Sequence, residues 1–409
     1  MDLIAKLSTA LSLFVVLFFV PAAKADAVID WNVKACEIAA GPASFDTPTA
    51  NRMLAVMHTA IYEAVNAITR RYPQSEIKLE APAGASIDAA VAAAGRATLL
   101  NFAPAKATEI EAAFKAATAA IADGMPKTDG IAIGEQAATA VIAARTFDAA
   151  IPPETYRPYT LPGVYVPTAM PLVSSWNLRK PWLMTSASQF RPGPPPKLTS
   201  DLWARDYNEI KAVGRKENSS RTAEQTDIAR FWEATGPSIY HGLLKSVSTS
   251  QGRDITRNAR LYMIVTQAVD DAMIAVFDAK YHYNFWRPVT AIRNGDIDGN
   301  DATERDASWT PFLNTPMHPE YPCAHCIVSG TVGTILQAEF GNGAMPVLST
   351  NSPTAQNAKR SWTNVEDFMQ EVANGRIYDG VHYRTSAEVG TSMGRRIGKL
   401  AADKFLGSK

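Results

Sequence analysis

The segment from Lys280 to Pro288, K-Y-H-Y-N-F-W-R-P, contains two cations at a spacing that suits anion binding. On an α-helix, residues seven apart point in directions that differ by about twenty degrees. Lys280 and Arg287 would then face the same way and repel each other unless an anion lies between them. Such a pair also occurs on solvated helix faces, so by itself it leaves both interpretations open.

A second segment, H-P-E-Y-P-C-A-H-C from His318 to Cys326, runs into an apolar stretch with helical character. A proline followed by small residues at a helix start leaves backbone N–H groups unpaired, and these attract anions. The N–H of Ala324 is a candidate for such a contact. His325 would stand in the first turn, where an imidazole can donate or accept a proton near neutral pH. A histidine that only caps or packs is the alternative.

The third segment, G-R-I-Y-D-G-V-H-Y, runs from Gly375 to Tyr383. Arg376 offers a planar fork of N–H donors that matches an oxyanion. A spacing of six does not place Arg376 and His382 on one face of a straight helix. We therefore predict that Gly380 breaks the helix and lets both side chains turn toward one site.

The elements that must position these segments are helices, because apolar residues recur at helical spacing through most of the chain. Alanine-rich stretches in the N-terminal part favour helices that pack closely. Residues 151–200 are dense in proline and contain several aromatic side chains, which predicts an ordered loop wrapping the bundle rather than a linker. Helices are expected at about residues 49–68, 86–101, 105–122, 130–149, 200–214, 222–235, 256–279, 324–340, 361–375 and 386–405.

The predicted fold class is all-α, with helical bundles in a single large domain over residues 26–409. Residues 26–200 would form the N-terminal bundle and the proline-rich loop, and residues 201–409 the C-terminal bundle with the anion site. Thr222 and Gln225 predict a capping box at one helix start.

The composition makes any anion preference a local property. The chain has 409 residues, 46% of them hydrophobic, with 40 Lys and Arg against 40 Asp and Glu. A balanced charge gives no net field for nucleic acid or an anionic membrane. We therefore expect small-molecule partners and no nucleic acid.

Residues 1–25 have the three parts of a secretory signal peptide. Lys6 precedes a mostly apolar run from Leu7 to Val20, and Ala23-Lys24-Ala25 forms a cleavage site. The apolar run is short for a membrane span. The sequence thus predicts a periplasmic or secreted protein with no membrane contact after cleavage.

Cysteines and aspartates leave further alternatives open. Cys323 and Cys326 form a C-x-x-C motif of the kind found in thiol–disulfide oxidoreductases, but a local disulfide or two inert thiols fit an all-α protein better. Asp270, Asp271 and Asp278 would suit magnesium, yet ion pairs and caps are the preferred interpretation. Asp296-x-Asp298-x-Asn300 is interpreted as a polar surface turn rather than a calcium loop.

Taken in order, the motifs K-x6-R-P, P-x-x-H and R-x3-G-x-H resemble the signature shared by vanadium-dependent haloperoxidases and type-2 phosphatidic acid phosphatases, which include bacterial acid phosphatases. His58 and the run A-V-N-A-I at residues 64–68 resemble the haloperoxidase branch. The resemblance spans most of the chain after the signal peptide. It implies vanadate as the cofactor, with phosphate able to occupy the same site.

The resemblance also implies a role for each matching residue. Lys280, Arg287 and Arg376 would neutralise the oxygens of the bound oxyanion, and Ala324 would donate its backbone N–H. His382 would be the axial ligand of vanadium, or the nucleophile of a phosphatase, and His325 the general acid and base. His318 would belong to a halide pocket. Trp286, beside Arg287, is a candidate for the wall of that pocket, with a core tryptophan as the default alternative.

At three positions the chain departs from the family pattern. Cys323-Ala324 replaces Ser-Gly before the catalytic histidine, Gly375 replaces a serine, and Ser386 stands where many relatives carry an aspartate. Three functions remain open. The first is a vanadate-dependent peroxidase that oxidises a halide, bromide most readily, with hydrogen peroxide. The second is a periplasmic acid phosphatase with a phosphohistidine intermediate. The third is a non-catalytic protein that binds an oxyanion.

Overall fold

Helices make up almost all the regular structure in the computed structural model, which describes residues 26–40, 45–145, 156–341 and 343–407. One short antiparallel hairpin pairs β1 (Leu348–Ser352) with β2 (Ala358–Trp362) in these ranges. The all-α prediction is confirmed. The helices are α1 Ala27–Ala40, α2 Thr47–Thr69, α3 Ile87–Phe102, α4 Ala107–Ala119, α5 Met125–Ala143, α6 Asp201–Val213, α7 Ala223–Phe231, α8 Ser238–Ser248, α9 Ile255–Tyr283, α10 Pro288–Arg293, α11 Ala324–Phe340, α12 Val365–Tyr378 and α13 Arg384–Phe405.

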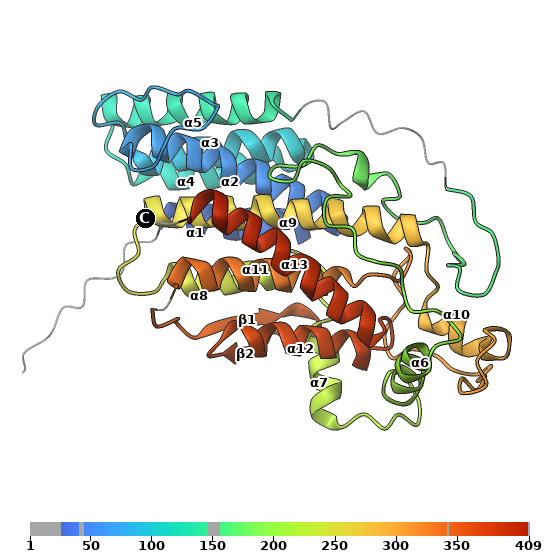
Figure 1. The fold of residues 1–409 in the computed structure, drawn as a ribbon. Helices are drawn as coiled ribbons and strands as arrows, with labels where there is room; N and C mark the ends of the chain where they lie inside the picture. Colours follow the sequence, from blue (N-terminus) through green and yellow to red (C-terminus); the bar gives the residue numbers. More distant parts are fainter. Residues whose placement is uncertain (1–25, 41–44, 146–155, 342, 408–409) are drawn as a thin grey trace, which may run out of the picture.

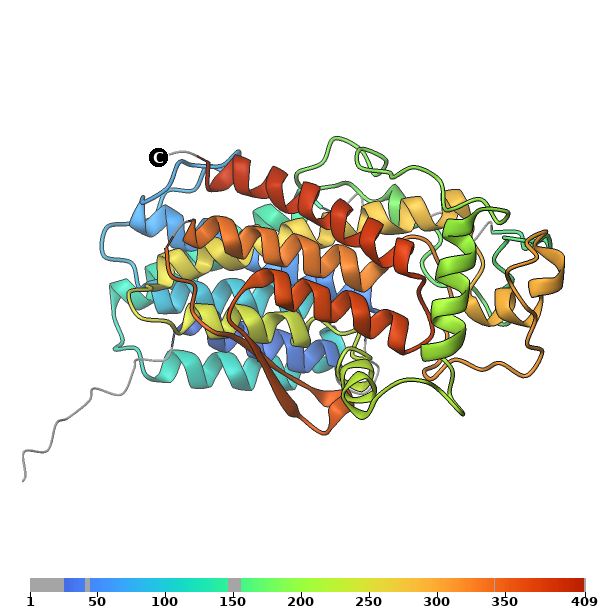
Figure 2. The ribbon, with the colours of Figure 1, turned by 60° about the horizontal axis from the view of Figure 1, so that its bottom comes forward.

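The long helix α9 lies in the middle of the molecule (Figure 1). It packs on α2 on one side and on α11 and α13 on the other, and it is buried over most of its length. Helices α2 to α5 form a layer beyond it, while α8, α11, α12 and the hairpin lie on the opposite side (Figures 1 and 2). The last turn of α9 carries Lys280.

The N-terminal layer owes its tightness to small residues. Residues 89–94 of α3 are all buried, and five of these six are alanine. A β-carbon added at Gly130 or Gly134 of α5 would lie 2.4 Å from Ser86 O or 2.3 Å from Ala90 O. Only glycine permits this approach of α5 to α3, and the rigid layer supports α2 and, through it, α9.

The proline-rich segment lies against α9, and the aspartates of α9 hold it there. Asp271 accepts hydrogen bonds from the backbone N–H groups of residues 182–184. Asp270 binds the Trp182 indole N–H and forms a buried ion pair with Arg52, at 2.6 Å. Asp278 pairs with Arg191 at 2.7 Å. The interpretation of these carboxylates as caps and ion pairs is confirmed.

Several boundaries and elements differ from expectation. The helices α1, α8 and α10 and the hairpin were not predicted; α10 has only six residues, but α8 carries apolar residues at helical spacing that were overlooked. The helix expected from residue 361 begins at Val365, where Asn364 caps it, because residues 358–362 pair in the hairpin. The capping box of Thr222 and Gln225 is present. The predicted signal peptide lies outside the described residues. Within the described ranges, we find no helix both long and apolar enough for a membrane crossing.

Candidate active site

The spacing of Lys280 and Arg287 predicted that one helix aligns their side chains. In the structure, a turn of the chain between two helices brings them together instead. Helix α9 ends at Tyr283, and Asn284 adopts a left-handed conformation with φ 48°. Arg287 then stands as the N-cap residue of the separate helix α10. Both side chains are buried, with 0% of Lys280 and 1% of Arg287 exposed. The correction removes the solvated-face alternative, since neither cation reaches water.

Each of the two cations is held by carbonyl groups. Lys280 Nζ donates to Pro319 O at 3.1 Å and to Glu320 O at 2.8 Å. Arg287 donates to His318 O at 2.9 Å and to Val381 O at 2.8 Å. Burial, together with the charge of Arg287, lowers the pKa of Lys280 to about 7. Burial also lowers the pKa of Arg287 to about 10.

The third segment turns as Gly380 predicted. Helix α12 ends at Tyr378, and Gly380 has φ +84°, where an added β-carbon would lie 2.3 Å from Gly214 O. This turn brings both Arg376 and His382 to the site. Arg376 is 3% exposed, donates to Trp232 O at 2.7 Å and forms an ion pair of 2.7 Å with Asp379. The Arg376 Nε lies buried with no hydrogen-bond partner among the described residues.

His382 is oriented by Glu320, a residue that the sequence analysis did not select. Nδ1 of His382 lies 2.7 Å from Glu320 Oε1, which also accepts the backbone N–H of Tyr383. Because Oε1 already acts as an acceptor there, Nδ1 carries the hydrogen and Nε2 keeps its lone pair. Burial and the three cations lower the pKa of His382, so the imidazole stays neutral.

Glu320 also explains how His382 can be oriented although Ser386 stands where many relatives carry an aspartate. Burial raises the pKa of Glu320 to about 7, while Lys280, Arg287 and the neighbouring Ser386 act in the opposite direction. The acid that orients His382 therefore comes from the segment before α11, not from the position of Ser386. The motif H-P-E-Y-P contained the signal, as an acidic residue in an otherwise neutral stretch shortly before His325.

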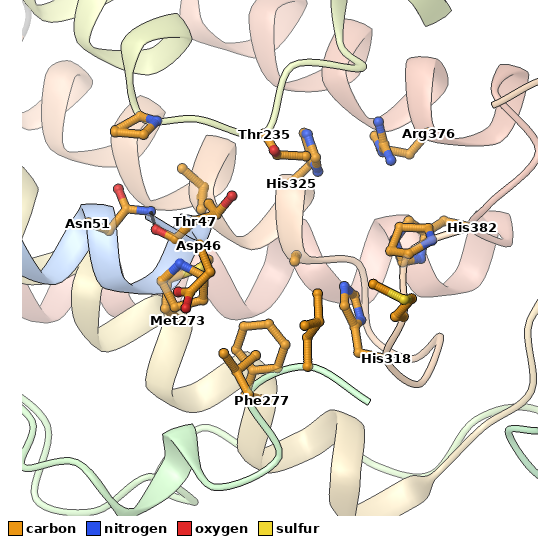
Figure 3. Close-up of a pocket in the computed structure, with 18 of the residues that line it drawn as sticks. Asp46, Thr47, Asn51, Thr235, Met273, Phe277, His318, His325, Arg376 and His382 are labelled. Atoms are coloured by element: carbon orange, nitrogen blue, oxygen red, sulfur yellow. Dashed lines mark hydrogen bonds between the residues drawn. The ribbon is translucent and has the colours of Figure 1, made fainter. Parts of the chain in front are cut away.

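A cavity of about 340 Å³ opens beside these groups. His325, Arg376, His382 and His318 lie at one end, and Asp46, Thr47 and Asn51 lie at the other (Figure 3). Ala324 and His325, in the first turn of α11, line the wall. His325 Nε2 lies 3.1 Å from Ala234 O, and burial lowers its pKa, so it is a neutral imidazole facing the cavity. Apolar residues, among them Met273, Phe277 and Val328, line much of the remaining wall.

Of the two residues assigned to a halide pocket, only His318 lines the cavity. Its ring stands edge-on to Phe277, with the centroids 5.3 Å apart, and its Nδ1 lies 3.0 Å from Arg287. Trp286 is instead 1% exposed in a separate aromatic cluster, stacked on Trp203 at 5.9 Å. The prediction for Trp286 is therefore corrected: the turn that points Arg287 inward points its neighbour into the core.

The two cysteines of the C-x-x-C motif are free thiols at the start of α11. Cys323 is the N-cap residue, and its sulfur accepts hydrogen bonds from Cys326 N at 3.3 Å and from Cys326 Sγ at 2.6 Å. Burial opposes ionisation of Cys323. The hydrogen bonds from Cys326 and the positive charges of Arg376 and Lys280 outweigh it, and the pKa of Cys323 is lowered.

The charges gathered here favour an anion. Lys280, Arg287 and Arg376 are opposed in the described site by only two acidic groups, Glu320 and Asp379, and burial raises the pKa of Asp379, like that of Glu320, to about 7. A buried excess of positive charge is costly unless a counter-ion compensates it. The unpartnered Nε of Arg376 adds a donor, and Nε2 of His382, which has a long contact of 3.5 Å with Arg287, adds a potential ligand. The site thus fits an oxyanion such as vanadate or phosphate.

Fold and site together define an all-α protein whose buried pocket, lined by His325 and His382, fits an oxyanion. A family model described as the "VCPO second helical-bundle domain" matches residues 260–407, which contain all the predicted site residues. The vanadium chloroperoxidase of Curvularia inaequalis is 24% identical over 162 residues. That match covers 33% of this chain and only 26% of the fungal protein.

Solved structures extend the similarity over nearly the whole chain. A bacterial vanadium-dependent iodoperoxidase is 26% identical, with a TM-score of 0.76 over 94% of this chain and 97% of its own. An apo-type bacterial vanadium-dependent chloroperoxidase shares the fold, with a TM-score of 0.69, 16% identity, and 86% and 92% of the two chains covered. These similarities support the superfamily that the sequence motifs resemble, that of vanadium-dependent haloperoxidases and type-2 phosphatidic acid phosphatases.

Proposed function

We propose that this protein is a vanadate-dependent peroxidase that oxidises a halide with hydrogen peroxide. The observation that carries the proposal is a neutral His382 whose Nδ1 is fixed by Glu320 and whose Nε2 has only a 3.5 Å contact with Arg287, beside three buried cations. Similarity to chloro- and iodoperoxidases supports the choice of chemistry.

Vanadate would be held by groups that are already in place. His382 Nε2 would ligate the metal, Lys280, Arg287 and Arg376 would neutralise its oxygens, and the N–H of Ala324 would donate a hydrogen bond. When bound, vanadate supplies a Lewis acid that activates hydrogen peroxide toward a halide. Because the cations are buried, their attraction for an oxyanion is screened much less than at a surface.

His325 is placed to move protons. Its neutral imidazole lines the cavity within the turn that also presents the Ala324 N–H. A neutral histidine can accept a proton from peroxide and return it to the departing oxygen as water forms. The apolar wall keeps bulk water away from this exchange, which strengthens the electrostatic interactions inside.

We favour bromide as the halide, on the position of His318. Its imidazole lines the cavity next to Arg287, and this pair can provide polarised N–H and cationic groups to a halide. Phe277, against the His318 ring, supplies an apolar surface that suits a large, weakly hydrated anion. Iodide, which is oxidised more easily, should also be a substrate.

The test is an assay of the vanadate-loaded protein with hydrogen peroxide and each halide, with a phenolic dye as acceptor for the oxidised halogen. We expect bromination and iodination that require both vanadate and peroxide. A protein that binds vanadate but oxidises no halide would refute the proposal.

An acid phosphatase is the second candidate, and Glu320 is the observation that favours it. A carboxylate at Nδ1 raises the nucleophilicity of His382 Nε2, which a phosphohistidine mechanism needs. His325 would then protonate the leaving group. Hydrolysis of a chromogenic phosphate ester, inhibited by vanadate, would support this candidate. Binding of vanadate with neither activity would support a non-catalytic oxyanion binder.

We further propose export of the protein to the periplasm or the medium, on the signal-peptide pattern of residues 1–25. Peptide mapping of the protein from its native host should find a mature N-terminus at Asp26. An N-terminus at Met1 would refute export through this segment.

A further inference from the structure

The thiols of Cys323 and Cys326 stand immediately behind the wall of the cavity. The two residues flank Ala324 and His325, both of which line the cavity, while the thiols themselves are 0% exposed. Their sulfur atoms are 2.6 Å apart. Neither thiol has a role in the proposed halide chemistry, and the family pattern places a serine, not a cysteine, before the N–H of Ala324.

We propose that Cys323 and Cys326 are a redox-active dithiol, a modification site at which hydrogen peroxide or a hypohalous acid from the cavity forms a reversible disulfide. The C-x-x-C spacing at a helix start suits such a bond, because both side chains lie on the same turn. Here the two sulfurs already touch, and no movement of the backbone between helices is needed to join them.

The hydrogen-bond pattern assigns the order of attack. Cys323 Sγ accepts both from the N–H of Cys326 and from its S–H, so negative charge is stabilised on Cys323 while Cys326 keeps its proton. Arg376 and Lys280 lie near enough to favour that charge electrostatically. Cys323 is therefore the nucleophile, and Cys326 is the residue that resolves the intermediate.

The proposed step is balanced with either oxidant. The Cys323 thiolate attacks one oxygen of hydrogen peroxide, the O–O bond breaks, and a sulfenic acid and hydroxide form. Cys326 then displaces hydroxide from that sulfur, which gives a disulfide and, with the two protons of the thiols, two waters in total. With a hypohalous acid, the dithiol is oxidised to the disulfide while the halogen is reduced to halide, with release of water and one proton.

The packing around the pair favours the disulfide over further oxidation. Cys323 and Cys326 pack on Ala373 and Ala387, and a β-carbon at Gly390 would lie 2.6 Å from Cys323 O. Such close packing leaves little space for a sulfinic or sulfonic acid. Cys36, the remaining cysteine, lies in α1, and burial raises its pKa to about 12, so it provides an internal control in the same chain.

The test uses the full-length protein, reduced with dithiothreitol, desalted, and treated with a small excess of hydrogen peroxide without vanadate or halide. After unfolding, free thiols are alkylated, the protein is digested, and the peptide masses are measured by mass spectrometry. We expect a Cys323–Cys326 disulfide in most molecules, reversed by dithiothreitol, with Cys36 fully alkylated. Alkylation of Cys323 and Cys326 to the same extent as Cys36 would overturn the proposal.

Two matched variants test the order of attack. In Cys326→Ser, a sulfenic acid should persist at Cys323 and be trapped by dimedone at least about tenfold more than at Cys326 in Cys323→Ser. Equal or reversed labelling would overturn the assignment of Cys323 as nucleophile. Because no vanadate or halide is present, these results stand apart from the haloperoxidase proposal, and the wild-type experiment does not depend on the folding of either variant.

Discussion

The interface of α3 with α5 and the cation site between α9, α11 and α12 are both fully buried, yet they are built on opposite principles. In the first, alanines and glycines bring two helices so close that a β-carbon at Gly134 would lie 2.3 Å from a backbone oxygen. In the second, Lys280, Arg287 and Arg376 are buried with carboxylates whose pKa values are raised. Neutral close packing stabilises the first, whereas the second carries charge at a cost to stability.

This difference suggests separate tasks for the two regions: the α3–α5 interface maintains the fold, and the cation site is the region proposed to bind an oxyanion. The close-packed layer supports α9, and α9 places Lys280 at the site. The scaffold therefore holds buried cations together at a cost in folding free energy, and a bound oxyanion would lower this cost. Changes in the site should therefore affect binding and activity far more than stability, and changes in the layer should do the reverse.

The largest effect is expected from His382→Ala, because it removes the residue that we propose as the ligand for vanadium. Whichever activity the protein has should fall by about 1000-fold or more. The circular dichroism spectrum and melting temperature should stay close to those of the wild type, and halide oxidation measured with added vanadate is the readout. Activity within tenfold of the wild type would show that His382 has no such role.

Glu320→Gln should have the next largest effect. The amide keeps the shape of the side chain and can still accept from Tyr383 N–H, but it weakens the acceptor at Nδ1 of His382. We expect vanadate affinity or kcat to fall by about 10–100-fold, as for other groups that orient a metal ligand. Ser386→Ala is the matched control, with a smaller effect, because Ser386 contacts Glu320 and not His382. Equal effects of both variants would contradict the role of Glu320.

Lys280→Met should sharpen the contrast between binding and stability. Phosphate affinity, measured by calorimetry, should fall by about tenfold or more, while the free energy of unfolding stays equal or rises, as after removal of other buried charges. Burial lowers the folded-state pKa of Lys280 from 10.5 to about 7. Wild-type stability should therefore rise with pH between these values, and the advantage of Lys280→Met should be greatest below pH 7.

Denaturant titrations of the wild type and Lys280→Met at pH 6 and pH 9.5 test this predicted dependence of the free energy of unfolding on pH. If Lys280→Met instead loses more stability at pH 6 than at pH 9.5, the lysine is stabilising as a cation and the charge excess proposed for the site is wrong.

Gly134→Val should have the smallest effect on the site. The added side chain would force α5 away from α3, at a cost of about 1–3 kcal/mol in the free energy of unfolding. Phosphate affinity of the folded protein should be unchanged. Ala132→Val, at an exposed position of the same helix, is the control and should cost less. A large loss of phosphate affinity in Gly134→Val would show that the α3–α5 interface affects binding at the cation site, and so contradict the division of tasks between them.

Sequence reasoning found the long helices and the cations of the site, because helical periodicity and charged residues next to glycine or proline are local signals. It missed the way in which Lys280 and Arg287 converge, because the stop signal in Asn284, a residue type that favours the left-handed end of a helix, was overlooked. The direction of Trp286 was missed for the same reason. Glu320 was missed because its partner, His382, lies 62 residues away and only the folded chain brings the two together.

The measurement that tests the central claim most directly is equilibrium binding of vanadate to the wild type and to Arg287→Met, with phosphate as competitor. If three buried cations and His382 form one oxyanion site, the wild type should bind one vanadate per chain, phosphate should displace it, and Arg287→Met should bind at least about tenfold more weakly. Undiminished binding by Arg287→Met, or binding that phosphate does not displace, would contradict the account.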